Sequence, residues 1–164
     1  MADHDPVRTL AKLAGGIRIG MLITRDEHDH LVGRPMAQQE TEFDGDMWFF
    51  AERGSRKVAH ITASPHVGLT LTSSDTWISI DGRAVVVEDR MKARELWNAW
   101  VEAWLPQGPD DPSVVLIKVT PTTAEYWDTP GGKVASALSF LKSKATGERY
   151  EGGEHEVVDL AEGS

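Results

Sequence analysis

The stretch MWFFAERGSRKVAHITA, Met47–Ala63, decides the fold of this chain. Its first residues, Met47–Ala51, form a short and very apolar run that predicts a β-strand. Its second half predicts a helix over Ser55–Ala63, with Ser55 as a favourable N-cap residue. Only Glu52–Gly54 separates the two elements, so the aromatic strand leads directly into the helix.

Further strands are predicted on both sides of this stretch, and their connections are short. They are Ile17–Thr24, Leu31–Gln39, Val67–Thr72, Trp77–Val87 and Val114–Val119, the last extended by Ala124–Trp127. Pro35 assigns the strand Leu31–Gln39 to a sheet edge or a bulge. Gly82 predicts a bulge or bend within the strand Trp77–Val87. Several connections lack the dozen or more residues that a crossover between parallel strands requires. The sequence therefore predicts a mainly β fold, in which an antiparallel sheet of about six strands closes into a barrel with helices packed outside.

Helices are predicted before, between and after the strands. They cover Pro6–Leu13, Asp89–Leu105 and Val134–Lys144. Asp5 and Asp89 are the expected caps of the first two. In the second helix Trp97, Trp100 and Trp104 share one face at helical spacing, and this face is expected to pack on the barrel.

The chain is expected to form a single domain over residues 1–146, a size that supports one hydrophobic core. Residues 147–164 read GERYEGGEHEVVDLAEGS, which is acidic and rich in glycine. Such a composition buries little apolar surface, so this segment is interpreted as a flexible C-terminal tail.

The charge of the chain excludes several classes of partner. Among 164 residues there are 17 Lys and Arg and 26 Asp and Glu, a formal net charge of −9. This charge argues against nucleic acid and against an anionic membrane surface. There is no cysteine, which removes disulfides, thiol catalysis and thiolate metal sites. The N-terminus is too charged for a signal peptide, and no apolar run is long enough to span a bilayer, so a cytoplasmic protein is expected.

The start of the central helix carries a candidate anion site, Gly54-Ser55-Arg56-Lys57. A helix N-terminus offers unpaired N–H groups and the positive end of the helix dipole. A hydroxyl, a guanidinium and an ammonium add three further donors. The alternative is that Arg56 and Lys57 are simply solvated.

Two other features point to the same region. The aromatic strand Trp48-Phe49-Phe50 could support a planar ligand, although burial on both faces in a dimer explains it equally well. Arg34 lies in the middle of a predicted strand, where it either faces solvent or meets an anionic group. The amides of Gln38 and Gln39 could read the edge of a heterocycle. No metal site is predicted, because His28 and His30 have no third ligand in view.

The order of four motifs carries a family resemblance. They are Arg34-Pro35-Met36, Trp48–Ala51, Ser55-Arg56-Lys57-Val58 and Ser64-Pro65-His66-Val67. Their order and spacing resemble the pyridoxamine 5′-phosphate oxidase-like flavoprotein superfamily, in particular its general stress protein branch. The resemblance covers roughly Leu10–Trp127.

The resemblance implies a six-stranded split β-barrel that forms a homodimer and holds FMN in two clefts at the subunit interface. Residues 34–39 would line the ring and the ribityl chain, Phe50 and Ala51 would continue this wall, and residues 55–57 would hold the phosphate. Trp127 would close the cleft from the partner subunit. The cofactor-binding residues implied are Arg34, Pro35, Met36, Ala37, Gln38, Gln39, Phe50, Ala51, Ser55, Arg56, Lys57, Trp77 and Trp127.

The chain departs from the oxidases where they grip their substrate. Gln39 stands where the oxidases have a lysine, and Ala135–Ser139 replaces their Arg-x-His signature. Vitamin B6 oxidation is therefore not expected. The leading hypothesis is an FMN-dependent oxidoreductase in which the flavin carries the chemistry and no side chain acts as catalyst. The alternatives are a protein that stores or senses flavin without turnover, FAD in place of FMN, and the deazaflavin F420, which the negative charge disfavours.

Overall fold

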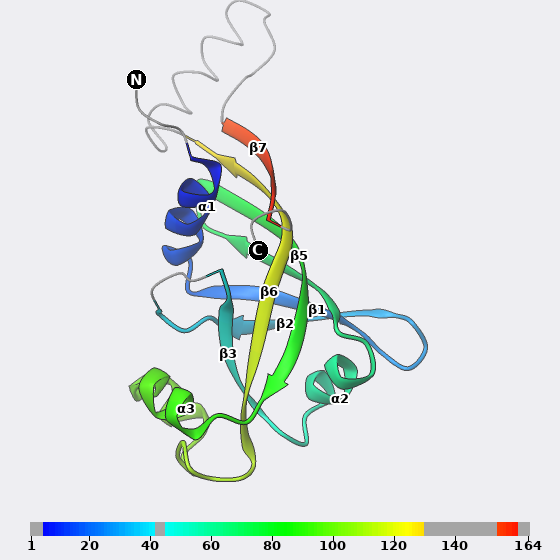
Figure 1. The fold of residues 1–164 in the computed structure, drawn as a ribbon, viewed down its shortest axis with the longest axis vertical. Helices are drawn as coiled ribbons and strands as arrows, with labels where there is room; N and C mark the ends of the chain where they lie inside the picture. Colours follow the sequence, from blue (N-terminus) through cyan, green and yellow to red (C-terminus); the bar gives the residue numbers. More distant parts are fainter. Residues whose placement is uncertain (1–4, 42–44, 130–153, 161–164) are drawn as a thin grey trace, which may run out of the picture.

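The structure is a computed structural model that describes residues 5–41, 45–129 and 154–160. Within these residues the strands form one seven-stranded sheet with the order β2-β1-β4-β5-β6-β3, and β7 pairs with β6 (Figure 1). Every pairing between strands is antiparallel. The strands are β1 (Ile19–Arg25), β2 (Leu31–Ala37), β3 (Met47–Glu52), β4 (His66–Thr72), β5 (Thr76–Val87), β6 (Val114–Asp128) and β7 (Glu154–Asp159).

The sheet curls until its two edge strands, β2 and β3, meet. Their contact is a single bridge between Gln38 and Phe49, supported by a hydrogen bond of 2.9 Å from the Gln39 N–H to the Trp48 carbonyl. The prediction of a mainly antiparallel β fold is confirmed. The expectation of a closed barrel needs correction, because a bridge and not a continuous ladder joins the edges.

The long pair β5 and β6 forms the spine of the sheet. Its register shifts between Asp81 and Gly82, which confirms the predicted bulge. A Cβ atom at Gly82 would lie 2.7 Å from the Thr120 carbonyl oxygen, so only glycine fits this close approach. On its other side β6 pairs first with β3 and then with β7.

Strand β7 corrects the interpretation as a flexible tail for residues 154–159, and residues 147–153 and 161–164 lie outside the described residues. Its residues pair with β6 from Thr123 to Asp128, and Val158 is only 5% exposed in the core. An acidic composition hid this strand, because one buried valine in alternation is a weak signal against the surrounding charges. The helix predicted over Val134–Lys144 lies outside the described residues.

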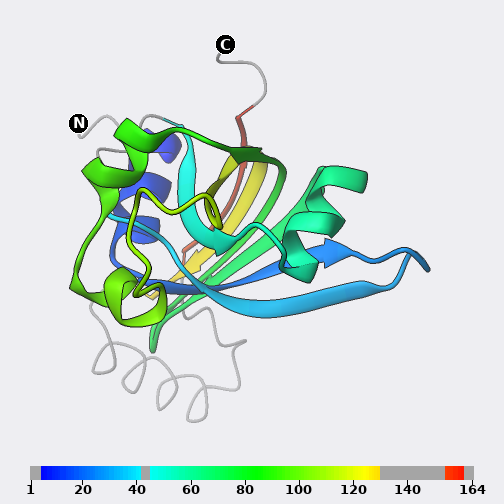
Figure 2. The same ribbon diagram turned by 90° about the horizontal axis from the view of Figure 1, so that it is seen from below.

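The helices of the described residues are α1 (Pro6–Gly15), α2 (Arg56–Ala63), α3 (Arg90–Leu96) and α4 (Ala99–Trp104). Asp5 and Asp89 cap α1 and α3 as predicted. Helices α1 and α2 lie at opposite ends of the sheet (Figures 1 and 2). No helix among the described residues has the length and apolar character needed to cross a bilayer.

The single helix predicted over Asp89–Leu105 is wrong, because Asn98 interrupts it. The Asn98 side-chain oxygen accepts hydrogen bonds from the Trp100 and Val101 N–H groups and so starts a new helix. The packed tryptophan face is wrong for Trp100 and Trp104, which are 65% and 80% exposed. Trp97 alone packs inward, with its ring edge-on to Phe50 at 5.3 Å.

Strand β3 is buried on both faces within one chain. Met47, Phe49 and Ala51 point into the main core, which also holds the buried faces of α1 and α2. Trp48 and Phe50 point to the other side, where helices α3 and α4 cover them. The aromatic strand therefore needs neither a ligand nor a second subunit to explain its composition.

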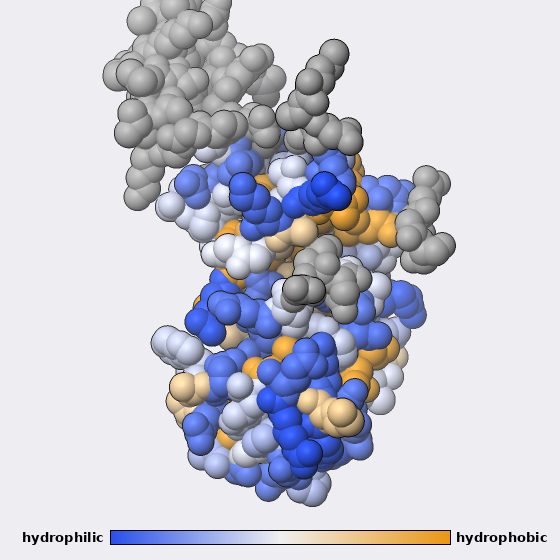
Figure 3. Space-filling model, turned by 60° about the vertical axis from the view of Figure 1, so that its left-hand side comes forward, coloured by the Kyte–Doolittle hydropathy of each residue, from blue (hydrophilic) through white to orange (hydrophobic). Residues whose placement is uncertain are grey.

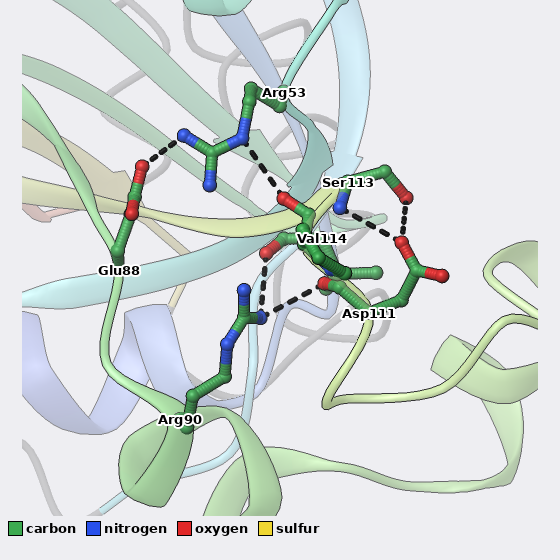
Figure 4. A network of polar contacts seen from close by, with 7 residues as sticks. Arg53, Glu88, Arg90, Asp111, Ser113 and Val114 are labelled. Atoms are coloured by element: carbon green, nitrogen blue, oxygen red, sulfur yellow. Dashed lines mark hydrogen bonds and ion pairs between the residues drawn. The ribbon is translucent and has the colours of Figure 1, made fainter.

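Arginine side chains fix the loop that follows α4 to the sheet (Figure 4). Arg90 Nη1 donates to the carbonyls of Pro109, Asp111 and Val114 at 3.0–3.2 Å. Arg53 Nε donates to the Pro112 carbonyl at 2.9 Å. This loop therefore has defined partners for its backbone oxygens.

Candidate functional site

The N-terminus of α2 is open where the other described helices are capped. The N-cap residue Ser55 makes no side-chain bond to the first turn of the helix. Its hydroxyl donates back to the Glu52 carbonyl at 2.7 Å instead. Asp5, Asp89 and Asn98 each accept N–H bonds at the start of their own helices. The first N–H groups of α2 thus remain accessible to an external acceptor.

Arg34 of β2 reaches the same end of the sheet. It pairs with Leu22 on the inward side of the hairpin, and its Nη1 donates to the Leu22 carbonyl at 3.2 Å and to Thr24 Oγ1 at 2.7 Å. The Thr24 hydroxyl in turn contacts His60 Nδ1 of α2 at 2.9 Å. The charge in the middle of the strand is therefore anchored by one nitrogen, and no protein group described in the structure meets the others.

Arg34, Arg56 and Lys57 form a group of positive charges that we call the cation cluster. Burial and then the Arg56 guanidinium hold the pKa of Arg34 below its usual value. Burial and then Arg34 lower the pKa of Lys57, and Glu52 opposes this shift to a lesser extent. In the described residues no carboxylate is bonded to any of the three cations.

The cation cluster therefore concentrates like charges beside an open helix N-terminus. Such an arrangement destabilises the empty site and favours a bound anion, since an anion offsets the repulsion between the like charges. A phosphate monoester carries up to two charges and offers several acceptor oxygens, which matches three cations and several N–H donors. The sequence-predicted residues Arg34, Arg56 and Lys57 are thus brought together by the fold.

The remaining residues of the predicted β2 wall have mixed positions. Pro35 is exposed, Met36 is only 8% exposed in the core, and Ala37 is half-buried. Gln38 donates its amide to the Ala14 carbonyl at 2.5 Å and also to the Ile17 carbonyl. Gln39 donates to the Ala37 carbonyl at 3.1 Å and accepts from the Asn98 amide at 2.8 Å.

These two glutamines also border a cavity of about 430 Å³. It lies between the C-terminal end of α1 and the start of β3, where Gly15, Gly16 and Met47 contribute to its lining. The face of the molecule that carries α1 and α3 is mostly hydrophilic, with apolar residues in small separate patches (Figure 3).

Of the two residues predicted on β3, Ala51 points into the main core and Phe50 points to the α4 side. They therefore lie on opposite faces of one strand and cannot form one continuous wall. The alternation of a strand dictates this result, because successive side chains point to opposite faces.

Trp77 and Trp127 face each other across β5 and β6 and are 44% and 38% exposed. The Trp127 ring stacks on His155 of β7 at 5.1 Å. Both tryptophans belong to an outer sheet face whose exposed apolar residues include Ile19, Met21, Trp77, Trp127 and Val157. This face points away from the core, whereas Arg34 points inward, so one chain alone does not join the tryptophans to the cation cluster.

Sequence reasoning missed Thr24 and His60, which are 1% and 5% exposed. Thr24 shares its strand face with Leu22, and hairpin pairing places that face beside Arg34. These two signals were available in the sequence, because alternation assigns the inward face and the turn assigns the register. No group of three or more metal-ligating side chains occurs in the described residues.

Comparisons with known proteins identify the family and the fold of this chain. The family model described as pyridoxamine 5′-phosphate oxidase like matches residues 5–151. Protein bli-3 of Neurospora crassa is 30% identical over 153 residues, which are 86% of this chain and 73% of that protein.

Two solved structures extend the comparison to the fold. A protein described as general stress protein 26 from Jannaschia sp. CCS1 is 26% identical, with a TM-score of 0.80 over 98% of this chain and 100% of the other. The general stress FMN/FAD binding protein of Xanthomonas citri is 26% identical, with a TM-score of 0.64 over 74% of this chain and 89% of the other. With a family model that matches most of its length and structures that share its split-barrel fold, this chain belongs to the pyridoxamine 5′-phosphate oxidase-like family.

Proposed function

We propose that this protein binds FMN and holds the FMN phosphate with Arg34, Arg56, Lys57 and the open N-terminus of α2. One observation carries the proposal: the cation cluster has no bonded carboxylate in the described residues, although the whole chain has a net charge of −9. Acidic residues are abundant, yet in the described residues none forms an ion pair with the cluster, and Glu52 only partly opposes the lowered pKa of Lys57. A cluster without a bonded carboxylate suits an anionic ligand.

The comparisons support a flavin as the molecule that carries this phosphate. The similar protein of Xanthomonas citri is described as FMN/FAD binding, and this chain shares its fold. Pro35 and Ala37 pair with Met21 and Ile19 and therefore lie on the outer sheet face, opposite the inward face that carries Arg34. Met36 contributes through the core, and Gln38 and Gln39 contribute by fixing the backbone of the strand end.

We further propose that two copies of the chain pair through the outer sheet face and complete the site together. Ile19, Met21 and Val157 are 53%, 41% and 65% exposed on this face, an unusual amount of apolar surface for one sheet. Trp77 and Trp127 lie on the same face, so pairing would bring the tryptophans of one copy to the outer face of the other, on which Pro35 and Ala37 lie. Analytical ultracentrifugation tests this proposal, and a monomer at micromolar concentration would contradict it.

The bound flavin supplies hydride or electron transfer, and the protein supplies binding and orientation. Arg34 and Lys57 hold the charged end of the ligand, and the open helix start adds backbone donors. No side chain is required as acid or base on this proposal. The reaction class is therefore a flavin-dependent oxidoreduction, with flavin storage or sensing as the competing function.

The first experiment titrates the flavin-free protein with FMN, riboflavin and FAD and follows the quenching of flavin fluorescence. FMN is expected to bind at least about ten-fold more tightly than riboflavin, since the phosphate contributes charge-assisted hydrogen bonds. Lys57→Gln should remove most of this preference. Arg53→Gln is the matched control, because Arg53 is paired with Glu88 and bonded to the Pro112 carbonyl. Equal affinity for FMN and riboflavin would contradict the proposal.

A second experiment separates catalysis from storage. The FMN-loaded protein is mixed with NADH or NADPH without oxygen, and the loss of the oxidised flavin bands is followed. Reduction faster than that of free FMN supports an oxidoreductase. A rate equal to that of free FMN with both donors supports storage or sensing.

A further inference from the structure

A buried polar pair, Thr24 and His60, lies directly beneath the cation cluster. The two residues come from β1 and α2 and are 1% and 5% exposed. Their contact is 2.9 Å, and the Thr24 oxygen lies 2.7 Å from Arg34 Nη1. Three elements that are far apart in the sequence are thus linked by two consecutive hydrogen bonds that end at the candidate site.

The chemistry of the three groups fixes the direction of the Arg34 bond and leaves two directions for the contact between Thr24 and His60. A guanidinium only donates, so Thr24 Oγ1 accepts from Arg34. The Thr24 hydroxyl then has its own proton to donate, and His60 Nδ1 is in place to accept it. Our inference takes this direction, in which Thr24 donates to Nδ1 and the His60 ring carries its proton on Nε2.

We infer that His60 is a positioning residue of the anion site, which acts through Thr24 to hold Arg34 in place. This inference rests on the proposed function, because it assigns His60 a role in binding the FMN phosphate. By accepting the Thr24 proton, His60 orients the hydroxyl oxygen toward Arg34. The anchored nitrogen then leaves the other guanidinium nitrogens available to the ligand.

The anchor is needed because the neighbours of Arg34 repel it. Arg56 and Lys57 both act on Arg34 as like charges, and no carboxylate within the described residues is bonded to Arg34. The second contact of Nη1, to the Leu22 carbonyl, is longer at 3.2 Å. Without the Thr24 bond, an arginine with several rotatable bonds would turn toward solvent and lose its preorganised position.

A purely structural role makes a different prediction. His60 lies on α2 between Val58 and Ile61, which are both buried in the core. If it only fills space and satisfies Thr24, its replacement changes stability and leaves the difference between FMN and riboflavin binding untouched. If it positions Arg34, its replacement weakens FMN binding specifically, and only while Arg34 is present.

The test is a double-mutant cycle on FMN affinity. His60→Leu removes the acceptor, and His60→Asn retains an acceptor oxygen near the position of Nδ1. We expect His60→Leu to weaken FMN binding about ten-fold, in line with the loss of one hydrogen bond to a charged group, and to leave riboflavin binding unchanged. His60→Asn should restore affinity to within about two-fold of the parent. In the Arg34→Ala background His60→Leu should have no further effect.

Two outcomes would overturn the inference. One is an equal loss of FMN affinity in His60→Leu and His60→Asn. The other is a loss in His60→Leu that persists in full without Arg34. If His60→Leu does not fold, the pair Thr24→Val and Thr24→Ser asks the same question, since only serine retains the hydroxyl that Arg34 contacts.

A measurement on the flavin-free protein separates this inference from the proposed function. Nitrogen-15 spectra of the histidine rings should show His60 as the neutral Nε2–H tautomer. A proton on Nδ1 would overturn the inference whatever the protein binds. Conversely, a parent protein that binds neither FMN nor inorganic phosphate would refute the proposed function even if the tautomer is as expected.

Discussion

Two groups of basic side chains have opposite surroundings. Arg53 is bonded to Glu88 and to the Pro112 carbonyl, and Arg90 donates to three backbone carbonyls (Figure 4). We call these two residues the paired arginines. Lys57, only four positions after Arg53 in the sequence, belongs to the cation cluster and has no bonded carboxylate in the described structure.

The pKa shifts express the same contrast. The hydrogen bond to Glu88 raises the pKa of Arg53 above its usual value. Burial and like charges lower the pKa of Arg34 and of Lys57. A cation whose pKa is raised stabilises the folded protein, and one whose pKa is lowered destabilises it until an anion binds. Arg53 therefore stabilises the fold, whereas the lowered pKa values of Arg34 and Lys57 support our proposal that the cation cluster binds an anion.

The largest expected effect comes from removing two charges of the cation cluster. Arg34→Gln combined with Lys57→Gln should weaken FMN binding ~100-fold or more, since each charge-assisted hydrogen bond contributes about 1.5–3 kcal/mol. Isothermal titration measures the loss. The control, Arg53→Gln with Arg94→Gln, removes the same charge from residues paired with Glu88 and Asp110. A similar loss in the control would show that net charge, and not the cluster, governs binding.

The next largest effect should come from a paired arginine and should appear in stability. Arg90→Met leaves the carbonyls of Pro109, Asp111 and Val114 without their common donor. The free energy of unfolding should fall by about 2–3 kcal/mol, while the folded protein keeps its affinity for FMN. Urea denaturation and a titration on the same sample test both parts. A weakened affinity for FMN with unchanged stability would show that Arg90 contributes to ligand binding and not to the fold.

A smaller loss is expected at the other paired arginine. Arg53→Met removes an exposed ion pair with Glu88 and one bond to the Pro112 carbonyl. Exposed pairs contribute little, because solvent screens them. The melting temperature should therefore fall clearly less than in Arg90→Met. The difference in melting temperature between the parent and Arg53→Met should shrink in high salt. A loss as large as that of Arg90→Met would show that the two residues act as one unit.

The smallest effect has the opposite sign and depends on pH. Lys57→Met should raise the stability of the flavin-free protein by roughly a few tenths of a kcal/mol at neutral pH, once solvent screening is allowed for. The pKa of Lys57 lies below its ordinary 10.5 in the folded state, so the unfolded chain binds more protons between the two values. Parent stability should therefore rise through this window as pH approaches 10.5, and the gain from Lys57→Met should vanish there. Paired urea titrations along the pH range measure this difference, and a gain that grows with pH would contradict it.

Much of the fold and part of the site could be predicted from the sequence for identifiable reasons. The hairpin, the bulge at Gly82 and the cap at Asp5 follow from local chemistry, namely alternation, a residue without Cβ and a side-chain acceptor. Arg56 and Lys57 were found because a helix start is a local feature. Arg34 was found because a charge in the middle of a strand conflicts with alternation.

The failures have physical causes that a sequence pattern does not contain. The helix break at Asn98 depends on a side chain that can either continue a helix or cap a new one. Strand β7 is acidic, and only its pairing with β6 makes it a strand. Hairpin pairing places Thr24 beside Arg34, but the contact of Thr24 with His60 joins β1 to α2, and no local rule predicts it.

The position of the cation cluster has a consequence for the edge strands β2 and β3, which a single bridge joins in the described residues. Arg34 belongs to β2, and Arg56 and Lys57 follow β3 closely in the chain. The cluster therefore combines a residue of one edge strand with two residues that closely follow the other, and one bridge otherwise joins these strands. An anion bound by Arg34 and by Arg56 and Lys57 would link the two edge strands. Edge amides of β2 and β3 should then exchange with deuterium more slowly when FMN is bound. The ligand would join two strands that no continuous ladder of backbone hydrogen bonds connects in the described part of the chain.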